Sequence, residues 1–198
     1  MLVCEQPTAR VNATTQDDPR TDLELIAALN AGEATAFDVL YYRHRDWAVA
    51  LAFRFTRDRD TALDILQETF LYLVRKFPGF ELTCQLRTFL YPAVRSLSIS
   101  ALRTADRVTS LDAWRASGEA HEPVAEPVVA AGDEELAAAL AGLSAEHREA
   151  LQLRFVEGFD LREIAEALEI PLGTVKSRLH HALSQLRESP RARKYFKD

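Results

Sequence analysis

The sequence has few cysteines and no long apolar run. Its 198 residues include only two cysteines, Cys4 and Cys84, which lie far apart and outside any Cys/His cluster. This spacing implies neither a disulfide framework nor a zinc site. No segment approaches the roughly 18 consecutive apolar residues of a membrane span, and the N-terminus lacks the apolar core of a signal peptide. We therefore expect a cytoplasmic protein that does not associate with a membrane.

Catalytic motifs are also missing. The sequence has no glycine-rich phosphate loop, no GxSxG or HExxH motif, and no paired carboxylates in a pocket-like context. The adjacent His180 and His181 would point about 100° apart on a helix, which is poor for joint metal ligation. His44 and His147 stand alone on polar faces, and we expect both to be solvated. The sequence predicts no enzyme, no metal site and no cofactor.

An excess of basic residues is lacking as well. Acids outnumber bases 30 to 24, and the formal net charge is −6. This balance argues against a histone-like protein that coats nucleic acid without regard to sequence. It leaves open specific DNA binding through a local patch, or through a larger partner that supplies most of the affinity.

What the sequence does contain is helical periodicity in two blocks. Four periodic segments lie between residues 21 and 103, and the pattern resumes at residue 133. Between them the periodicity is poor, and acids outnumber arginines. We expect an all-α protein with a disordered leader (1–20), a helical domain (21–105), a flexible acidic linker (106–132) and a second helical domain (133–198). The expected helix N-caps are Thr21 or Asp22, Asp58 or Asp60, and Ser144.

The segment from Phe159 to Leu186 predicts two short helices joined by a tight turn at Pro171. No acid occurs between Pro171 and Arg187, whereas an unconstrained surface mixes both signs. Such a pair is typical of the helix-turn-helix, which places its second helix in the DNA major groove. Taken alone, the segment fits equally a helical hairpin with a solvated face. The candidate DNA-binding residues are Thr174, Lys176, Ser177, Arg178, His180, His181 and Arg187.

A second acid-free run extends from Gln85 to Arg103. It combines arginines and hydroxyl groups with two aromatic side chains. This combination suits melted DNA, because arginine binds phosphate and unstacked bases stack on rings. Alternatively the aromatics belong to the core, and we expect this of at least one. Pro92 is expected to kink or break the helix. The candidates are Arg87, Phe89, Tyr91, Arg95 and Arg103.

The helix before this run, within residues 60–77, has a core-facing stripe and a second face of mixed character. On the second face two acids, a leucine and a base recur at helical spacing. Mixed faces of this kind dock in the grooves of partner proteins. A solvated face without a partner explains the same pattern more simply. The candidates are Asp64, Glu68, Leu71 and Arg75.

Three blocks in this order resemble one known family. DTALDILQETFLYLVRKFPGF, LRTFLYPAVRSLSISALR and LSAEHREALQLRFVEGFDLREIAEALEIPLGTVKSRLHHALSQLR are similar to extracytoplasmic-function (ECF) sigma factors of bacterial RNA polymerase. The resemblance covers roughly residues 21–104 and 133–188. The third block also fits other helix-turn-helix regulators, whereas the QETF block at this distance upstream is far more specific.

The resemblance implies a role for each block. The QETF helix would dock on the clamp helices of the largest polymerase subunit, which adds Gln67 to the candidate face. The acid-free helix, with Ser96 among its contacts, would capture and open the −10 promoter element. The C-terminal hairpin would contact the −35 element, and the linker would thread toward the polymerase channels. The implied partners are core RNA polymerase, promoter DNA and an anti-sigma factor.

The promoter-opening helix departs from the family pattern. Phe89 stands where tryptophan is common, Ser96 where asparagine is usual and Ser100 where aspartate is usual. Pro92 is also unexpected. We therefore expect an altered or unusually strict −10 preference. Two other functions stay open: a stand-alone helix-turn-helix regulator that ignores polymerase, and an interaction protein that kept the architecture but lost promoter melting.

Overall fold

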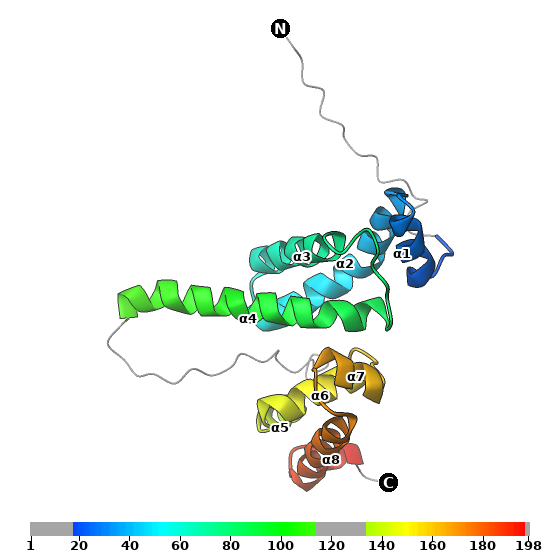
Figure 1. Cartoon of the computed structure of the whole chain (residues 1–198). Coiled ribbons are helices and arrows are strands. Elements are labelled where there is room, and N and C mark those ends of the chain that lie inside the picture. Colours follow the sequence, from blue (N-terminus) through cyan, green and yellow to red (C-terminus); the bar gives the residue numbers. More distant parts are fainter. Residues whose placement is uncertain (1–17, 114–133, 197–198) are drawn as a thin grey trace.

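A computed structural model of the chain describes residues 18–113 and 134–196. All regular structure within these ranges is helical, as predicted, and forms two lobes (Figure 1). The predicted leader falls almost wholly outside the described residues, as does the linker beyond residue 113. The N-terminal lobe contains α1 (Asp22–Asn30), α2 (Thr35–Thr56), α3 (Arg59–Val74) and α4 (Leu86–Ala113). The C-terminal lobe contains α5 (Glu134–Ala141), α6 (Ala145–Phe155), α7 (Leu161–Ala167), α8 (Leu172–Glu188) and the short 3-10 helix η2 (Arg193–Phe196).

Capping residues start two helices of the N-terminal lobe, α1 and α3, where the sequence predicts them. The Thr21 hydroxyl accepts a hydrogen bond from the Glu24 N–H at 3.3 Å, and the Glu24 carboxylate accepts one from the Thr21 N–H at 2.6 Å. Asp58, and not Asp60, caps α3 by accepting from the Thr61 N–H at 2.7 Å. These bonds satisfy N–H groups that have no partner inside the helix.

The core of the N-terminal lobe lies among α2, α3 and α4, and α1 closes one end of it. Asn30 at the end of α1 fastens the loop that leads into α4. Its side-chain oxygen accepts from the N–H groups of Gly79 at 2.7 Å and Phe80 at 3.2 Å, and its amide donates to the Phe80 carbonyl at 2.8 Å. This anchor ties the loop before α4 to the end of α1. Fully buried core residues include Leu25, Leu40, Leu73, Leu86 and Leu90.

His44 is buried, so the expectation that it is solvated is wrong. Its Nε2 atom lies 2.7 Å from Oδ2 of Asp22, and Oδ1 of the same carboxylate accepts a hydrogen bond from the guanidinium of Arg43 at 2.6 Å. Burial raises the pKa of Asp22, but these two neighbours outweigh it and hold the pKa below 3.8. Because Asp22 belongs to α1 and His44 to α2, the periodicity of α2 gives no sign of the contact.

α4 is continuous through Pro92, where a kink or a break was expected, and it extends to Ala113, beyond the expected end. Pro92 lies about two turns from the helix start, and its missing N–H removes one backbone bond, the one to the Thr88 carbonyl. No glycine or proline occurs between Arg103 and Ala113, so no residue there stops the helix. The predicted start of the linker at residue 106 therefore lies inside α4.

In the C-terminal lobe, α6 and α8 pack together and α7 contacts both. Ser144 caps α6 as predicted, because its hydroxyl accepts from the His147 N–H at 3.3 Å. Arg148 on α6 ties down the end of α5, where helix carbonyls lack partners. Its guanidinium donates to the carbonyl oxygens of Leu140, Ala141 and Leu143.

The predicted helical hairpin consists of α7 and α8. Asp160 caps α7 by accepting from the N–H groups of Arg162 at 2.6 Å and Glu163 at 2.9 Å. In the turn, Glu169 has a φ of 53°, and Pro171 precedes the first residue of α8. The predicted apolar face of α8 is buried and comprises Val175, Leu179, Ala182 and Leu186.

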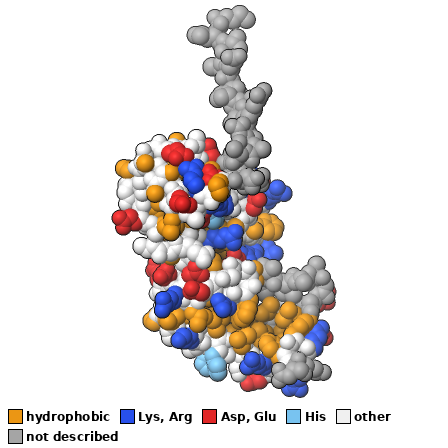
Figure 2. All heavy atoms as spheres, turned by 90° about the vertical axis from the view of Figure 1, so that its right-hand side faces the viewer, with side chains coloured by type: hydrophobic (Ala, Val, Ile, Leu, Met, Phe, Trp, Pro, Cys, Tyr) orange, Lys and Arg blue, Asp and Glu red, His pale blue; other side chains and the backbone are white. Residues whose placement is uncertain are grey.

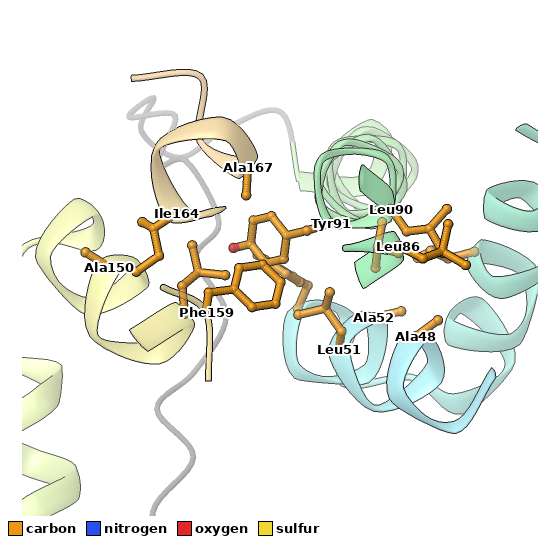
Figure 3. Close-up of a cluster of buried hydrophobic side chains, with 14 of the residues drawn as sticks. Ala48, Leu51, Ala52, Leu86, Leu90, Tyr91, Ala150, Phe159, Ile164 and Ala167 are labelled. Carbon is orange, nitrogen blue, oxygen red and sulfur yellow. The ribbon is translucent and has the colours of Figure 1, made fainter. Parts of the chain in front are cut away.

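The two lobes are in contact through α4 and α7 (Figure 1). Figure 3 shows the ring of Tyr91, on α4, beside the ring of Phe159, which precedes α7. The ring centroids lie 6.2 Å apart in an edge-to-face arrangement, and both side chains are almost completely buried. The apolar interior is therefore continuous from one lobe into the other.

Candidate nucleic-acid interface

The outward face of α8 carries the residues predicted to contact DNA. Lys176, Ser177, His180 and His181 are exposed, and Thr174 is half-buried in the first turn. Within α8 the first acid is the final residue. In a helix-turn-helix the N-terminal part of the second helix faces base edges. The face therefore combines a cation for phosphate with hydroxyl and imidazole groups that can bind bases.

Two of the predicted cations on α8 have partners inside the C-terminal lobe. Arg178 forms an ion pair with Glu146 of α6 at 2.8 Å, and its side chain is only 18% exposed. The guanidinium of Arg187 lies 5.7 Å from the ring centroid of Phe196. Arg178 must therefore exchange Glu146 for a phosphate group if it is to bind DNA.

Helix α4 presents part of its acid-free run to solvent. Ser96 and Arg103 are exposed. Arg87 is half-buried, and its guanidinium lies 5.7 Å from the ring centroid of Trp47 on α2. The quadrupole of an indole ring attracts a cation that lies over its face. This contact orients the Arg87 side chain toward Trp47.

An aromatic cluster around Phe89 borders a cleft between α3, α4 and α7. The Phe89 ring stacks on Tyr72 with centroids 5.8 Å apart and lies 4.7 Å from the ring of Phe80. The cleft has a volume of about 680 Å³ and brings together residues of two predicted sites. Its lining includes Glu68, Arg75, Cys84, Phe89, Ser96, Glu166 and Glu169.

Cys84 lines this cleft and is partly buried. Burial, followed by the negative charge of Glu166, raises the pKa of Cys84 above 9.0. A raised pKa keeps the sulfur protonated, and the thiolate is the nucleophilic and metal-binding form.

Tyr91 and Arg95 of α4 bind the C-terminal lobe. The Tyr91 hydroxyl donates to Glu149 of α6 at 2.7 Å, and Nε of Arg95 donates to the same carboxylate oxygen at 2.6 Å. Burial and the charge of Glu149 raise the pKa of Tyr91 well above 10.0. The expectation that at least one aromatic of this run is a core residue is confirmed by Tyr91, which is 3% exposed.

A second carboxylate of the C-terminal lobe, that of Glu157, contacts α2. It accepts hydrogen bonds from Nε1 of Trp47 at 2.6 Å and from the guanidinium of Arg54. These partners lie 110 and 103 residues away in the sequence. Because the pairs are so distant along the chain, no periodicity or motif pointed to Trp47, Arg54, Glu149 or Glu157.

The predicted partner face of α3 is exposed along the helix. Leu71 at its centre is 46% exposed, and its predicted neighbours on this face, Asp64, Gln67, Glu68 and Arg75, are exposed too. The opposite stripe, with Ile65, Leu66 and Phe70, is buried. An accessible leucine between charged side chains can insert into a partner's groove.

The C-terminal lobe also exposes apolar surface that the sequence analysis missed. Figure 2 shows hydrophobic side chains gathered on this lobe. A groove of about 340 Å³ is bordered by α5, α6, α8 and η2. Phe155, which is 66% exposed, and Tyr195 lie on it. Contiguous exposed apolar surface is typical of protein-binding sites.

Across residues 18–113 and 134–196, no group of three or more His, Cys, Asp or Glu side chains is placed to hold a metal ion. His147 is half-buried, not solvated as expected, and its ring stacks on that of His181 with centroids 6.2 Å apart. None of the helices that the structure describes is long and apolar enough to cross a membrane.

Comparisons with known families match both lobes. Residues 40–108 match the family described as Sigma-70 region 2, and residues 139–188 match Sigma-70, region 4. The chain is 35% identical over 164 residues to the ECF RNA polymerase sigma factor SigL of Mycobacterium tuberculosis, covering 82% of this chain and 93% of that protein. It is 27% identical over 177 residues to the ECF RNA polymerase sigma factor SigW of Bacillus subtilis, covering 84% and 95%.

Solved structures with a similar fold include two complexes. The sigma factor RpoE in complex with the anti-sigma factor NepR from Bartonella quintana is 25% identical, with a TM-score of 0.54 over 77% of this chain and 92% of that one. CnrH in complex with the cytosolic domain of CnrY shares the fold with a TM-score of 0.57 and 22% identity, over 83% and 93% of the two chains.

Proposed function

Because the chain belongs to the ECF class of RNA polymerase sigma factors, we propose that it binds core RNA polymerase and directs promoter-specific transcription initiation. The observation that carries this proposal is the 35% identity across 93% of a curated ECF sigma factor. Regions 2 and 4 follow one another in the same chain. The protein acts in the cytoplasm, where the polymerase is, and it is not an enzyme, because the polymerase performs the chemistry.

Each lobe binds a different promoter element in this proposal. The domain over residues 21–105 binds core polymerase and the −10 element, and the domain over residues 133–198 binds the −35 element. The region 2 match begins within the first range and the region 4 match lies within the second. The net charge of −6 fits this role, since polymerase supplies much of the non-specific DNA affinity.

The −35 element is contacted by α8. Lys176 and Arg187 bind phosphates and fix the register, while Thr174, Ser177 and His181 face base edges. His180 and Arg178 complete the surface, the latter after releasing Glu146. Two observations support this assignment. Within α8 no acid precedes Glu188, and the exposed residues of the helix include Lys176, Ser177, His180 and His181.

The −10 element is contacted by α4. Arg87, Arg95 and Arg103 bind phosphates, Phe89 and Tyr91 offer rings to unstacked bases, and Ser96 stands at the position where relatives carry asparagine. The exposure of Ser96 and Arg103 supports this assignment. Tyr91 and Arg95 become available only when they leave Glu149, so the lobes must separate.

Core polymerase docks on α3 through Asp64, Gln67, Glu68, Leu71 and Arg75. The support is the continuous exposure of this face and the accessibility of Leu71. The complex of the sigma factor RpoE with the anti-sigma factor NepR among the similar structures also supports a regulatory partner. An anti-sigma factor is accordingly the third partner that we propose.

Two experiments with the full chain test the proposed function. A pull-down with purified core polymerase separates a sigma factor from a stand-alone helix-turn-helix regulator, which would leave the polymerase unbound. Run-off transcription then separates it from an interaction protein that has lost promoter melting. A chain that binds core polymerase but starts no transcript would contradict the proposal.

A further inference from the structure

Two buried glutamates of the C-terminal lobe have their partners on the N-terminal lobe. The side chains of Glu149 and Glu157 are each 6% exposed. Each binds one arginine and one aromatic donor, on α4 in the case of Glu149 and on α2 in the case of Glu157. The lobes are therefore joined by two charge-assisted clusters in addition to the apolar contact of Tyr91 with Phe159.

Such clusters specify one geometry without making it permanent. A buried carboxylate loses its water, and only a complete set of partners compensates for the loss. When the carboxylate and its arginine return to water together, the net change in free energy is small. When only one of them is lost, the other charge stays buried without a partner and strongly destabilises the fold. The two glutamates thus favour this arrangement of the lobes over other packings and still permit it to open.

The C-terminal lobe covers the part of the acid-free helix α4 around Tyr91 and Arg95, and it leaves Ser96 and Arg103 exposed. Glu149 binds Arg95, and Glu166 and Glu169 line the cleft that holds Phe89 and Ser96. Carboxylates of the protein therefore occupy the side of α4 where a DNA strand would bring its phosphates. The outward face of α3 and that of α8 remain exposed in the same arrangement.

We propose that this closed arrangement is an autoinhibited state of the free protein, in which its own C-terminal lobe masks the part of the −10 surface of α4 around Tyr91 and Arg95. The masking is uneven, because Leu71 on the polymerase face of α3 and Lys176 on the −35 face of α8 stay accessible, whereas Glu68 and Arg75 border the same cleft as Glu166 and Glu169. Polymerase can therefore dock first, and separation of the lobes then exposes α4. The identity of the masked surface rests on the proposed function, whereas the closed arrangement itself does not.

Energy transfer between two dyes measures the closed arrangement directly. The dyes are attached through azido amino acids at Asp38 on α2 and Gln185 on α8, both exposed, so that Cys84 is left intact. We expect high transfer in the free wild-type chain, low transfer in Glu157→Arg, and recovery in the charge-exchanged Arg54→Glu/Glu157→Arg. Arg54→Glu alone should also open the lobes, because it removes the partner of Glu157 on the N-terminal lobe. It serves as an independent variant in case Glu157→Arg does not fold.

A DNA-binding assay then tests the masking. Fluorescence anisotropy follows a fluorescein-labelled pool of mixed-sequence single-stranded DNA, and Glu135→Arg is the matched control. Glu135 pairs with Lys194 within the same lobe and is 62% exposed, so its replacement changes the net charge equally without touching the lobe boundary. We expect Glu157→Arg to bind at least about tenfold more tightly than this control.

Two results would overturn the inference. One is energy transfer between the dyes in the wild-type chain that is as low as in Glu157→Arg, which would mean that the free chain is already open. The other is equal DNA affinity of Glu157→Arg and Glu135→Arg, which would mean that α4 is not masked. Failure of the proposed function is distinguishable, because it appears as missing run-off transcripts with core polymerase and leaves the energy transfer unchanged.

Discussion

Glu149 on α6 accepts a hydrogen bond of 2.7 Å from the hydroxyl of Tyr91 on α4, across the boundary between the lobes. Arg95 donates to the same carboxylate. Tyr91 and Arg95 also belong to the proposed −10 surface. The arrangement of the lobes and the availability of that surface are therefore coupled through one buried carboxylate.

High pH should break this contact. The pKa of Tyr91 lies well above 10.0 in the folded chain, because burial and the charge of Glu149 disfavour the phenolate. A raised pKa means that the neutral phenol stabilises the fold. This contribution is complete below pH 10 and is lost as the pH rises through the raised pKa.

Ultraviolet absorbance of tyrosinate measures this titration. We expect a late phase above pH 10 that disappears in Tyr91→Phe, and dye transfer between the lobes should fall over the same range. If Tyr91→Phe instead removed absorbance from the main phase near pH 10, Tyr91 would ionise like an exposed tyrosine and the expectation would be wrong.

Lys176→Ala should weaken promoter binding of the complex with polymerase to a similar degree for all sequences. Lys176 is an exposed cation on α8, so its loss removes about one phosphate contact and lowers the slope of log K against log salt by about 1. Mobility-shift titrations at several salt concentrations measure the slope. Lys194→Ala, outside α8, is the control and should leave it unchanged; equal slopes for wild type and Lys176→Ala would remove Lys176 from the interface.

Leu71→Ala should weaken binding to core polymerase about tenfold and leave folding nearly unaffected. The side chain is 46% exposed, so the free energy of unfolding should change by no more than about 0.5 kcal/mol, whereas loss of an apolar anchor costs about 1–2 kcal/mol of binding. Leu63→Ala removes another exposed leucine of α3, about 80° around the helix from Leu71, and is the matched control. Equal affinities of both variants for immobilised core polymerase would argue against the proposed docking face.

Ser96→Asn should shift the −10 preference without destabilising the chain. Ser96 is exposed on α4, and an asparagine amide can bind adenine in ways that a hydroxyl cannot. Start sites mapped with the wild type and the variant should differ at one or two −10 positions, while the free energy of unfolding stays within about 0.5 kcal/mol. Identical −10 sequences for the two proteins would mean that Ser96 does not contact the element.

Local features of the fold could be predicted from the sequence because they depend on neighbouring residues. Thr21 and Ser144 cap the helices that follow them, and the apolar spacing from Val175 to Leu186 predicted the buried face of α8. The change of composition at residue 106 predicts an end of α4 that is too early. The helix continues to Ala113, because no glycine or proline stops it before that residue.

The relation between the lobes could not be predicted in this way. Glu149 and Tyr91 are 58 residues apart, and Glu157 and Arg54 are 103 apart. An acid or an arginine on a helix face looks the same in sequence whether it is solvated or paired with a distant element. The same limit explains why buried His44 was expected in water: its partner Asp22 lies on another helix.

In vitro transcription of genomic fragments with purified core polymerase, followed by mapping of start sites, shows whether this chain gives polymerase its promoter choice. We expect starts that depend on the protein and that share two short upstream elements at a constant spacing. Starts that lack such shared elements, or no protein-dependent starts from a chain that binds core polymerase, would contradict this expectation.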